Sequence, residues 1–407
     1  MADRDSGLHR AINLPLLVLY GLGTIVGAGI YALIGEIAGT AGYGAPAAFL
    51  FASIIAGFTA CSFAELSARF PRAAGAALYV REGFGHKSLA RAVGLAVMVS
   101  GMASAAALVN GFQGYLTDFA SFERATTILA VTLIIGAIAA WGIAESVRIA
   151  AAITLIEIGG LVAVIAVGAD AILLLPQRWE LFLPGTDAAG WTGILMGITL
   201  SFYAFIGFED MVDVAEEVKQ VRRTMPIGIL LTLGIATVLY LSLMTTALVT
   251  LTPQELAASS APMSTLYAAH TGGEPIFIGV IALFAIINGA LIQIIMASRV
   301  LYGLASRGQL PAVFSRIHAR TQTPIVATAA ITAGVLLLAL IGRLSGLATT
   351  TSLIMLCIFS GVNFALWRIK GRDESAPPTT LIFPRWLPLI GGTLSAAFVI
   401  HEIVHHL

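Results

Sequence analysis

The sequence predicts an all-α integral membrane protein with about eleven transmembrane helices. Of its 407 residues, 58% are hydrophobic and only 11% are charged, whereas about a quarter of the residues in an average soluble domain are charged. The charged residues are also segregated, which leaves uncharged stretches longer than the ~18 residues needed to span a bilayer. These stretches cover 11–35, 37–64, 92–117, 188–208 and 224–254. This number of charges is too small to cover a surface that faces water. We therefore expect the protein to lie in a lipid bilayer.

Apolar runs bounded by polar residues or by Pro and Gly predict the individual helices. The runs lie at 15–38, 44–67, 91–114, 125–143, 148–170, 191–214, 226–250, 275–303, 324–342, 346–368 and 383–403. We expect a single membrane domain over 1–407, in which 15–170 is a first five-helix unit and 191–369 a second. The segment 383–403 is then an additional C-terminal helix.

The distribution of Lys and Arg predicts the orientation in the membrane. With the N-terminus in the cytoplasm, nineteen of the 22 basic residues fall on the cytoplasmic side, and only Arg124, Arg178 and Arg343 fall on the other. Because cytoplasmic loops carry an excess of Lys and Arg, we predict a multi-pass protein of the cytoplasmic membrane with a cytoplasmic N-terminus. The formal net charge of zero gives no field that would attract a nucleic acid, so no nucleic-acid partner is expected.

Two of the predicted helices are interrupted in the middle. The first contains four glycines in GLGTIVGAGIY (21–31), and each glycine inside a helix costs about 1 kcal/mol relative to alanine. The sixth contains SFYAFIGFED (201–210), where Glu209 lies at membrane depth, an unfavourable place for a carboxylate that neither lines a cavity nor has a partner. An alternative for the first segment is close helix packing, because Gly23 and Gly27 form a Gly-x-x-x-Gly pair.

The two interruptions lie five helices apart. Because five is odd, a second five-helix unit enters the membrane from the opposite side, which makes helices 1–5 and 6–10 an inverted repeat. Broken helices at matching positions of two inverted units indicate a binding site near the middle of the membrane. The sequence therefore favours a carrier, with the broken helices around its site.

Four segments carry a resemblance to a known family. They are GTIVGAGIY (23–31), FAELSARFPRAAGAALYV (63–80), FIGFEDMVDVAEEVKQVRRTMP (205–226) and SRVLYGLASRGQLP (298–311). With them the chain resembles the amino acid–polyamine–organocation permeases, which share the leucine-transporter fold, over nearly its whole length. Many relatives have twelve helices where eleven are predicted here, but the ten-helix repeat is complete. The resemblance implies alternating-access transport of an amino acid or a related amine, with no enzymatic activity, cofactor or metal.

The broken helices offer the chemistry that such a substrate needs. A half-helix that begins near Gly27 presents free N–H groups to a carboxylate, and unpaired carbonyls at the two breaks accept hydrogen bonds from an ammonium group. The resemblance adds Tyr203 as an aromatic gate, although a tyrosine there could equally belong to the core. The expected substrate-binding residues are Thr24, Ile25, Val26, Gly27, Ala28, Gly29, Tyr203, Ala204, Phe205, Ile206 and Gln293.

The eighth helix carries two polar residues, Asn288 and Gln293. The resemblance places Gln293 against the substrate side chain. Because five helical positions rotate by about 140°, at most one of the two faces the site, and the other is expected to bond a neighbouring helix. On the third helix, the small residues Ser100, Gly101 and Ser104 leave room for several kinds of substrate side chain.

Two intramembrane carboxylates are candidates for proton coupling or gating. Glu157 lies within the fifth helix, where many relatives place a lysine, and a buried carboxylate can bind and release a proton near neutral pH. The alternative is a neutral, hydrogen-bonded acid that ties the fifth helix to the first or eighth. Glu209 competes for the same role. Sodium coupling is disfavoured because 284–292 lacks the hydroxyls that sodium-driven proteins of this fold supply from the eighth helix. Protons are therefore the expected co-substrate, in symport or exchange.

Two other classes of function compete with the carrier. The C-terminal HEIVH (401–405) matches the His-Glu-x-x-His motif, so an intramembrane zinc metalloprotease is the alternative. Such an enzyme needs a third protein ligand and a substrate cleft, neither of which the sequence indicates. Glycine-rich broken helices also line channels, but no ring of polar residues indicates a selectivity filter.

Overall fold

A computed structural model describes most of the chain. The described residues are 10–26, 29–72, 75–117, 119–120, 122–141, 147–173, 175–183, 188–273, 276–372, 377 and 380–406, without the side chains of 147–150, 188–189 and 405–406. Within these residues there are seventeen α-helices and three 3₁₀-helices, and the only β-type pairing is an isolated bridge between Ile12 and Val218. The all-α prediction is confirmed.

The helices follow one another as the hydropathy predicts. The first half of the chain forms α1 (Leu14–Val26), α2 (Gly29–Ala41), η1 (Gly42–Gly44), α3 (Ala45–Arg69), α4 (Gly75–Phe84), α5 (Lys87–Leu116), α6 (Arg124–Trp141), α7 (Val147–Val167), α8 (Ala169–Ile172) and α9 (Leu175–Phe182). The second half forms α10 (Ala188–Tyr203), η2 (Phe208–Glu217), α11 (Val221–Thr250), α12 (Pro253–Ala258), α13 (Pro262–Thr271), α14 (Ile276–Ser306), η3 (Ala312–Ser315), α15 (Ile325–Ile341), α16 (Leu344–Lys370) and α17 (Trp386–His406).

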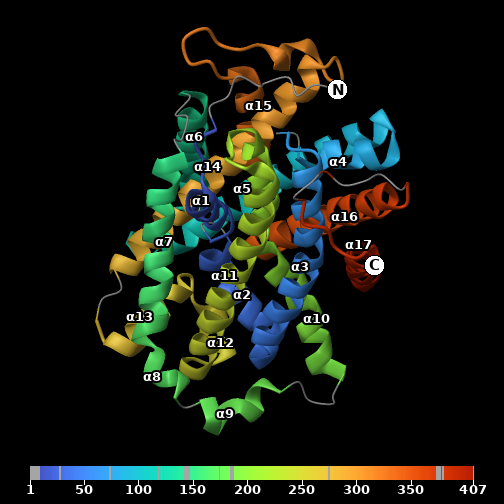
Figure 1. Cartoon of the computed structure of the whole chain (residues 1–407). Coiled ribbons are helices and arrows are strands. Elements are labelled where there is room, and N and C mark those ends of the chain that lie inside the picture. Colours follow the sequence, from blue (N-terminus) through green and yellow to red (C-terminus); the bar gives the residue numbers. More distant parts are fainter. Residues whose placement is uncertain are drawn as a thin grey trace.

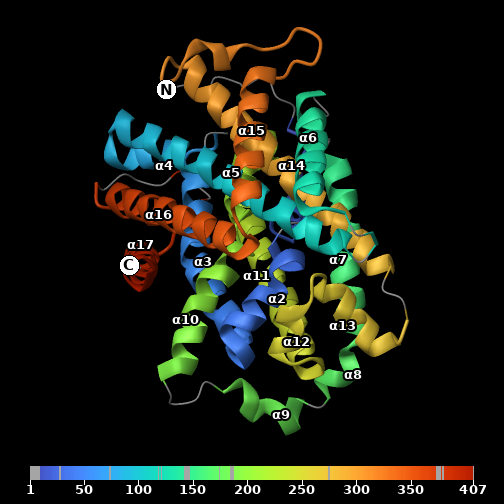
Figure 2. The same cartoon turned by 180° about the vertical axis from the view of Figure 1, so that it is seen from behind.

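Every predicted transmembrane segment falls on one helix or on two consecutive helices. In the described part of the chain, eight helical stretches are long and apolar enough to cross a membrane, and α1, α15 and the 151–167 part of α7 are shorter apolar helices. The short helices α8, α9 and α12 lie at the end of the molecule away from α15 in both views of the fold (Figures 1 and 2). The membrane class is confirmed, while the number of crossings stays a prediction.

The sixth segment is broken where the sequence indicates. The helix α10 ends at Tyr203, a turn follows over 204–207, and the chain continues as η2. In the first segment, α1 ends at Val26 and α2 begins at Gly29, and Gly27 and Ala28 lie outside the described residues. A break within the sixth segment is therefore confirmed.

In four of the five cases, helices five positions apart in the predicted order pack against each other. The second and seventh segments pair as α3 with α11, the third and eighth as α5 with α14, and the fourth and ninth as α6 with α15. The first and sixth meet where α1 packs on η2 and α2 packs on α10. A two-fold relation between two five-helix units produces this pairing, so it supports the inverted repeat, which stays a prediction.

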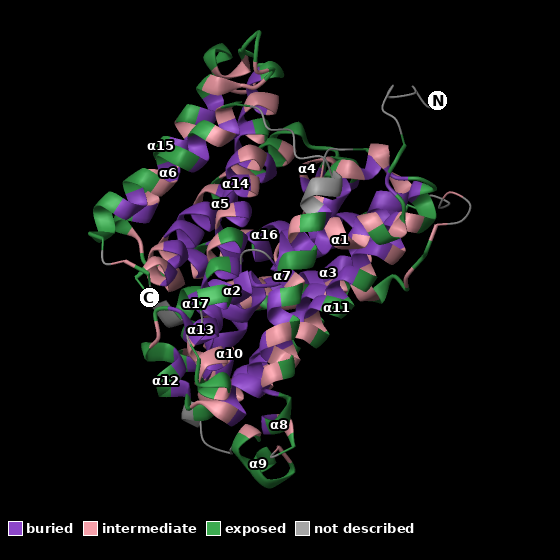
Figure 3. Cartoon of the chain, turned by 90° about the vertical axis from the view of Figure 1, so that its left-hand side faces the viewer, coloured by how far each residue is buried: buried purple, intermediate pink, exposed green. Residues whose placement is uncertain are grey.

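Burial separates a protein core from the outer surface of the helices (Figure 3). Buried residues fill the space between the helices, including an aromatic cluster of Phe63, Phe202, Phe208 and Phe359. Large apolar side chains are exposed on the outer helices, among them Leu133 and Ile134 of α6, Ile156 of α7, Val238 of α11 and Leu337 of α15. A water-soluble surface avoids apolar patches of this extent, and a lipid-facing surface requires them.

Candidate functional site

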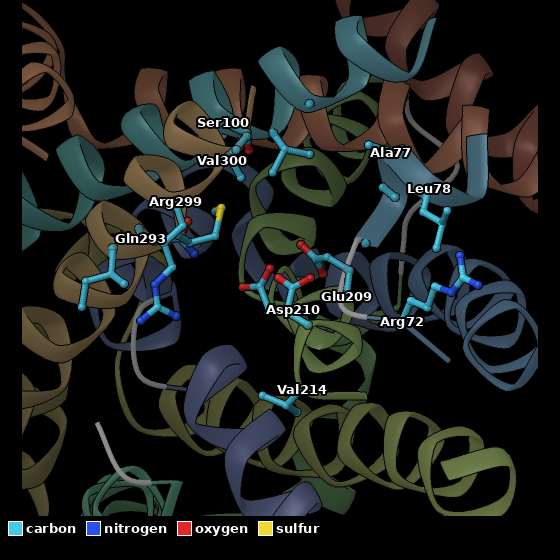
Figure 4. Close-up of a pocket in the computed structure, with 18 of the residues that line it drawn as sticks. Arg72, Ala77, Leu78, Ser100, Glu209, Asp210, Val214, Gln293, Arg299 and Val300 are labelled. Carbon is cyan, nitrogen blue, oxygen red and sulfur yellow. The ribbon is translucent and has the colours of Figure 1, made fainter. Parts of the chain in front are cut away.

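A cavity of about 1410 Å³ runs into the protein between η2, α4, α5, α14 and α16 (Figure 4). Buried residues line its inner part, among them Ser100, Ser104, Gln293 and Thr351. Exposed cations line its mouth: Arg72, Arg81, Lys87, Arg91 and Arg307. All five belong to the basic residues that the charge distribution assigns to the cytoplasm. The cavity therefore opens toward the predicted cytoplasmic side.

Hydrogen bonds close the opposite end of the cavity. The hydroxyls of Ser104 on α5 and Tyr203 on α10 share a hydrogen bond of 2.9 Å, and both side chains are buried. Farther out, the Tyr115 hydroxyl donates to the carbonyl of Tyr31 at 2.9 Å and accepts from the backbone N–H of Met263 at 3.3 Å. These bonds connect α5 to α10, α2 and α13, so the described helices are bonded to one another between the inner part of the cavity and the predicted extracytoplasmic side.

The break in α10 is held in place by Thr24 and Glu209. The backbone N–H of Gly207 donates to the Glu209 carboxylate at 2.9 Å, and the Gly207 carbonyl accepts from the Thr24 hydroxyl at 2.9 Å. Gly207 has a φ of 128°, which favours glycine, and a Cβ there would lie 2.6 Å from the Thr24 carbonyl oxygen. The end of α1 and the break in α10 therefore lie directly against each other.

The backbone groups expected at the site are mostly buried around this junction. Thr24, Ile25, Val26, Gly29, Tyr203, Ala204 and Phe205 are all buried. The Ile25 carbonyl accepts from the Tyr240 hydroxyl at 3.0 Å, and the Tyr203 carbonyl accepts from the Ile206 N–H at 3.2 Å. Each of these carbonyls thus has a partner within the protein and retains a second lone pair. Gly27 and Ala28 lie outside the described residues.

Three side chains from the sequence-based candidates line the cavity itself. They are Ile206 and Glu209, which follow the break in α10, and Gln293 on α14. Figure 4 shows Glu209 and Gln293 on different walls of the cavity. A cavity that ends at broken helices, with an amide on one wall and a carboxylate on the other, suits a small polar molecule better than a polymer.

Comparison with known proteins agrees with this geometry. The family model described as amino acid permease matches residues 13–404. The chain belongs to the amino acid permease family. The match covers both predicted five-helix units and α17, so family membership rests on nearly the whole chain and not on isolated motifs.

Relatives of this permease occur in plants, bacteria and the mouse. The vacuolar cationic amino acid transporter 2 of Arabidopsis thaliana is 30% identical over 401 residues, which cover 92% of this chain and 62% of that protein. The branched-chain amino acid permease BcaP of Bacillus subtilis is 26% identical over 348 residues, 80% of this chain and 73% of that protein. An uncharacterized transporter of Mycobacterium tuberculosis is 29% identical and covers 98% of this chain and 88% of that protein. The chain spans about three fifths of the length of the plant transporters.

The two polar residues of α14 behave as the helical spacing predicts. Gln293 lines the cavity, whereas the Asn288 amide donates to the Glu157 carboxylate of α7 at 3.2 Å. The Tyr31 hydroxyl of α2 donates to the Glu157 backbone carbonyl at 2.6 Å. Glu157 is 1% exposed and is not among the cavity-lining residues. Its carboxylate therefore connects α7 to α14, and its backbone connects α7 to α2.

Four charged residues were not identified from the sequence as functional candidates. Asp210 and Asp213 of η2 and Arg299 of α14 line the cavity, and Lys370 of α16 pairs with Glu65 of α3 at 2.5 Å. The Asp-x-x-Asp spacing directly after the break was a usable signal, because residues three apart share a face of a 3₁₀-helix. Arg299 and Lys370 were assigned only to the cytoplasmic side, and nothing in the sequence pairs them with an acid.

The C-terminal HEIVH motif takes part in helix packing. Glu402 is buried and accepts a hydrogen bond of 3.1 Å from the Thr199 hydroxyl of α10. Among the described residues, no group of three or more His, Cys, Asp or Glu side chains is placed to hold a metal ion, and the His405 side chain lies outside them. The protease alternative therefore has no support from the structure or from the family.

Proposed function

We propose that this chain is a secondary active carrier that moves amino acids or related amines across the cytoplasmic membrane by alternating access. The observation that carries the proposal is the cavity, which is open at the cationic mouth, closed at Ser104 and Tyr203, and bounded by the break in α10. A channel would need a path open at both ends, whereas a carrier exposes its site to one side at a time. The described conformation corresponds to a carrier open to the cytoplasm.

The substrate carboxylate and ammonium would be recognised near the junction of α1 and α10. Val26, Gly27, Ala28 and Gly29 would supply N–H groups, and carbonyls at Thr24, Ile25, Tyr203, Ala204 and Phe205 would accept from the ammonium group. Gln293 and Ile206 line the adjoining cavity, where they would contact the substrate side chain. Tyr203 would gate the site from the extracytoplasmic side through its bond with Ser104.

The relatives narrow the range of substrates to be tested. Three plant relatives and a mouse relative are named cationic amino acid transporters, and a bacterial relative is named a branched-chain amino acid permease. The cavity wall formed by η2 carries the carboxylates of Glu209, Asp210 and Asp213, which would attract a cationic side chain. We therefore place lysine, arginine and ornithine ahead of leucine and valine as candidate substrates.

Protons are the proposed driving ion, with Glu157 as the coupling site and Glu209 as a gating residue. Glu157 is buried, and its carboxylate accepts a hydrogen bond from the neutral amide of Asn288, a donor that is compatible with both protonation states of the acid. Glu209 holds the N–H of Gly207 at the break, so a change in its charge would act on the hinge itself. A carboxylate buried within a membrane-spanning helix is an unfavourable charge, and this favours a role that includes reversible protonation.

Uptake into proteoliposomes tests the carrier. Radiolabelled cationic and branched-chain amino acids and polyamines would be supplied with and without an inward proton gradient, and Glu157→Gln would be compared with wild type. We expect saturable, gradient-driven accumulation that Glu157→Gln abolishes. Saturable exchange that ignores the gradient would retain the carrier and refute the coupling site. Absence of transport for every amine tested would refute the carrier.

A further inference from the structure

Opposite charges face each other across the cytoplasmic half of the cavity. Asp210 and Asp213 lie on η2, and Arg299 lies on α14. Because side chains three apart eclipse in a 3₁₀-helix, the two aspartates form a column on one side of η2. Figure 4 shows Asp210 beside Glu209 on one side of the cavity and Arg299 on the other. Arg299 also acts electrostatically on Asp213.

The charges are separated in this conformation. Among the described residues, no ion pair within 4 Å joins Arg299 to Asp210 or Asp213, and Arg299 is exposed. Arg299 and Asp213 are exposed and Asp210 is half-buried, so the separated charges remain accessible to solvent and lose little free energy. The same charges gain attraction when the walls approach and water leaves. The separation is thus what an open gate requires.

The position of Arg299 along α14 fits a gate between the site and the cytoplasm. Gln293 and Met296 line the cavity farther inside, and Arg307 lines its mouth two turns farther out. On the facing wall, the Asp213 carboxylate lies 3.4 Å from the position of a Cβ at Gly75, beside the first turn of α4. A contact between α14 and η2 at this level would separate Gln293 from the mouth.

We propose that Arg299 and the aspartate column of Asp210 and Asp213 form the cytoplasmic gate of the carrier. The gate is open in the described conformation, while the bond between Ser104 and Tyr203 closes the other end. Its ion pair closes when the site turns to the extracytoplasmic side. The proposal rests on the proposed carrier function and adds the residues that alternate with Tyr203.

Thiol labelling tests the gate without relying on transport. Met296→Cys places a reporter one turn inside Arg299, in a background carrying Cys61→Ala and Cys357→Ala. A membrane-impermeant thiol reagent is applied to the cytoplasmic face of membranes holding the full chain. Removing the ion pair, by Arg299→Gln or by Asp210→Asn with Asp213→Asn, favours the cytoplasm-open state. We expect labelling to become about two- to fivefold faster, the range of a partly exposed ion pair.

Three controls make the result specific. Arg299→Lys retains the charge and should label at the wild-type rate. Arg307→Gln removes an arginine of the same helix that lies outside the gate, and it should leave the rate unchanged. Unchanged labelling in both charge-removing variants, or no recovery with Arg299→Lys, would overturn the gate. Uptake measured in parallel separates the two proposals. If the wild type transports no substrate, the carrier is refuted. If uptake is intact but the labelling rate does not depend on the charges, only the gate is refuted.

Discussion

Replacing Gly207 with alanine should damage the junction between α1 and α10. The φ of 128° at Gly207 lies in a region that side-chain-bearing residues rarely adopt. A Cβ there would lie 2.6 Å from the carbonyl oxygen and 2.8 Å from the carbonyl carbon of Thr24. Because both atoms belong to the backbone, a side-chain rotation cannot relieve the clash, and α1 must move away from α10.

The expected cost has two parts. An unfavourable backbone conformation costs about 1–3 kcal/mol, and overpacking of a well-packed site costs about another 1–3 kcal/mol. Displacement of α1 would also weaken the hydrogen bond of Thr24 to the Gly207 carbonyl, worth about 1 kcal/mol. We therefore expect roughly 2–6 kcal/mol of destabilisation from these two parts, to which the weakened hydrogen bond adds up to about 1 kcal/mol, concentrated where the substrate is proposed to bind.

Thermal unfolding in detergent and substrate binding would be measured on the same preparation. The matched control is Gly234→Ala on α11, where a Cβ meets no atom within 4 Å and the helix should become slightly more stable. We expect a lower melting temperature and lost binding for Gly207→Ala, with Gly234→Ala at or above wild type. A Gly207→Ala protein that melts and binds like wild type would refute the close contact between the end of α1 and the break in α10.

Three further substitutions test separate contacts. Tyr203→Phe removes the hydroxyl bonded to Ser104, worth about 1 kcal/mol, so thiol reagents applied from outside should reach the cavity about fivefold faster; equal access would contradict this closure. Asn288→Ala removes the amide that donates to Glu157 and should shift the pH dependence of uptake. An unchanged pH dependence would indicate that Glu157 has only a structural role. Glu65→Gln leaves two buried cations without their carboxylate and should destabilise the protein by about 3–5 kcal/mol, measured by thermal unfolding; a change below about 1 kcal/mol would show that the pairs contribute little.

The helices were predictable because their signals are local. Hydropathy locates each segment, and glycines with a carboxylate at membrane depth locate the break after Tyr203. Spacing on α14 also separated the roles of Asn288 and Gln293, since residues five apart in a helix cannot face the same way. Local spacing also accounts for the pair of Glu65 and Arg69, which lie four residues apart on α3 with 2.8 Å between the charged groups.

Contacts between distant segments could not be predicted in this way. Lys370 reaches Glu65 across 305 positions, and Thr24 reaches Gly207 across 183. Glu402 shows that a local motif can also suggest a role that the fold does not support. It belongs to a motif typical of zinc enzymes, but its carboxylate accepts a hydrogen bond from Thr199 of a neighbouring helix. In each case the partner is set by which helix faces are brought together, and hydropathy carries no information on that choice.

The sequence by itself determined the membrane class, the order of the helices and the interruption after Tyr203, because each depends on residues close together in the chain. Only the tertiary structure decided which residues line the cavity mouth, which carbonyls already have partners, and that Asp210 and Asp213 line the same cavity as Arg299. The physical reason is that a bilayer-spanning helix satisfies its own backbone and can pack in many ways, whereas a cavity depends on how several such helices are arranged around it.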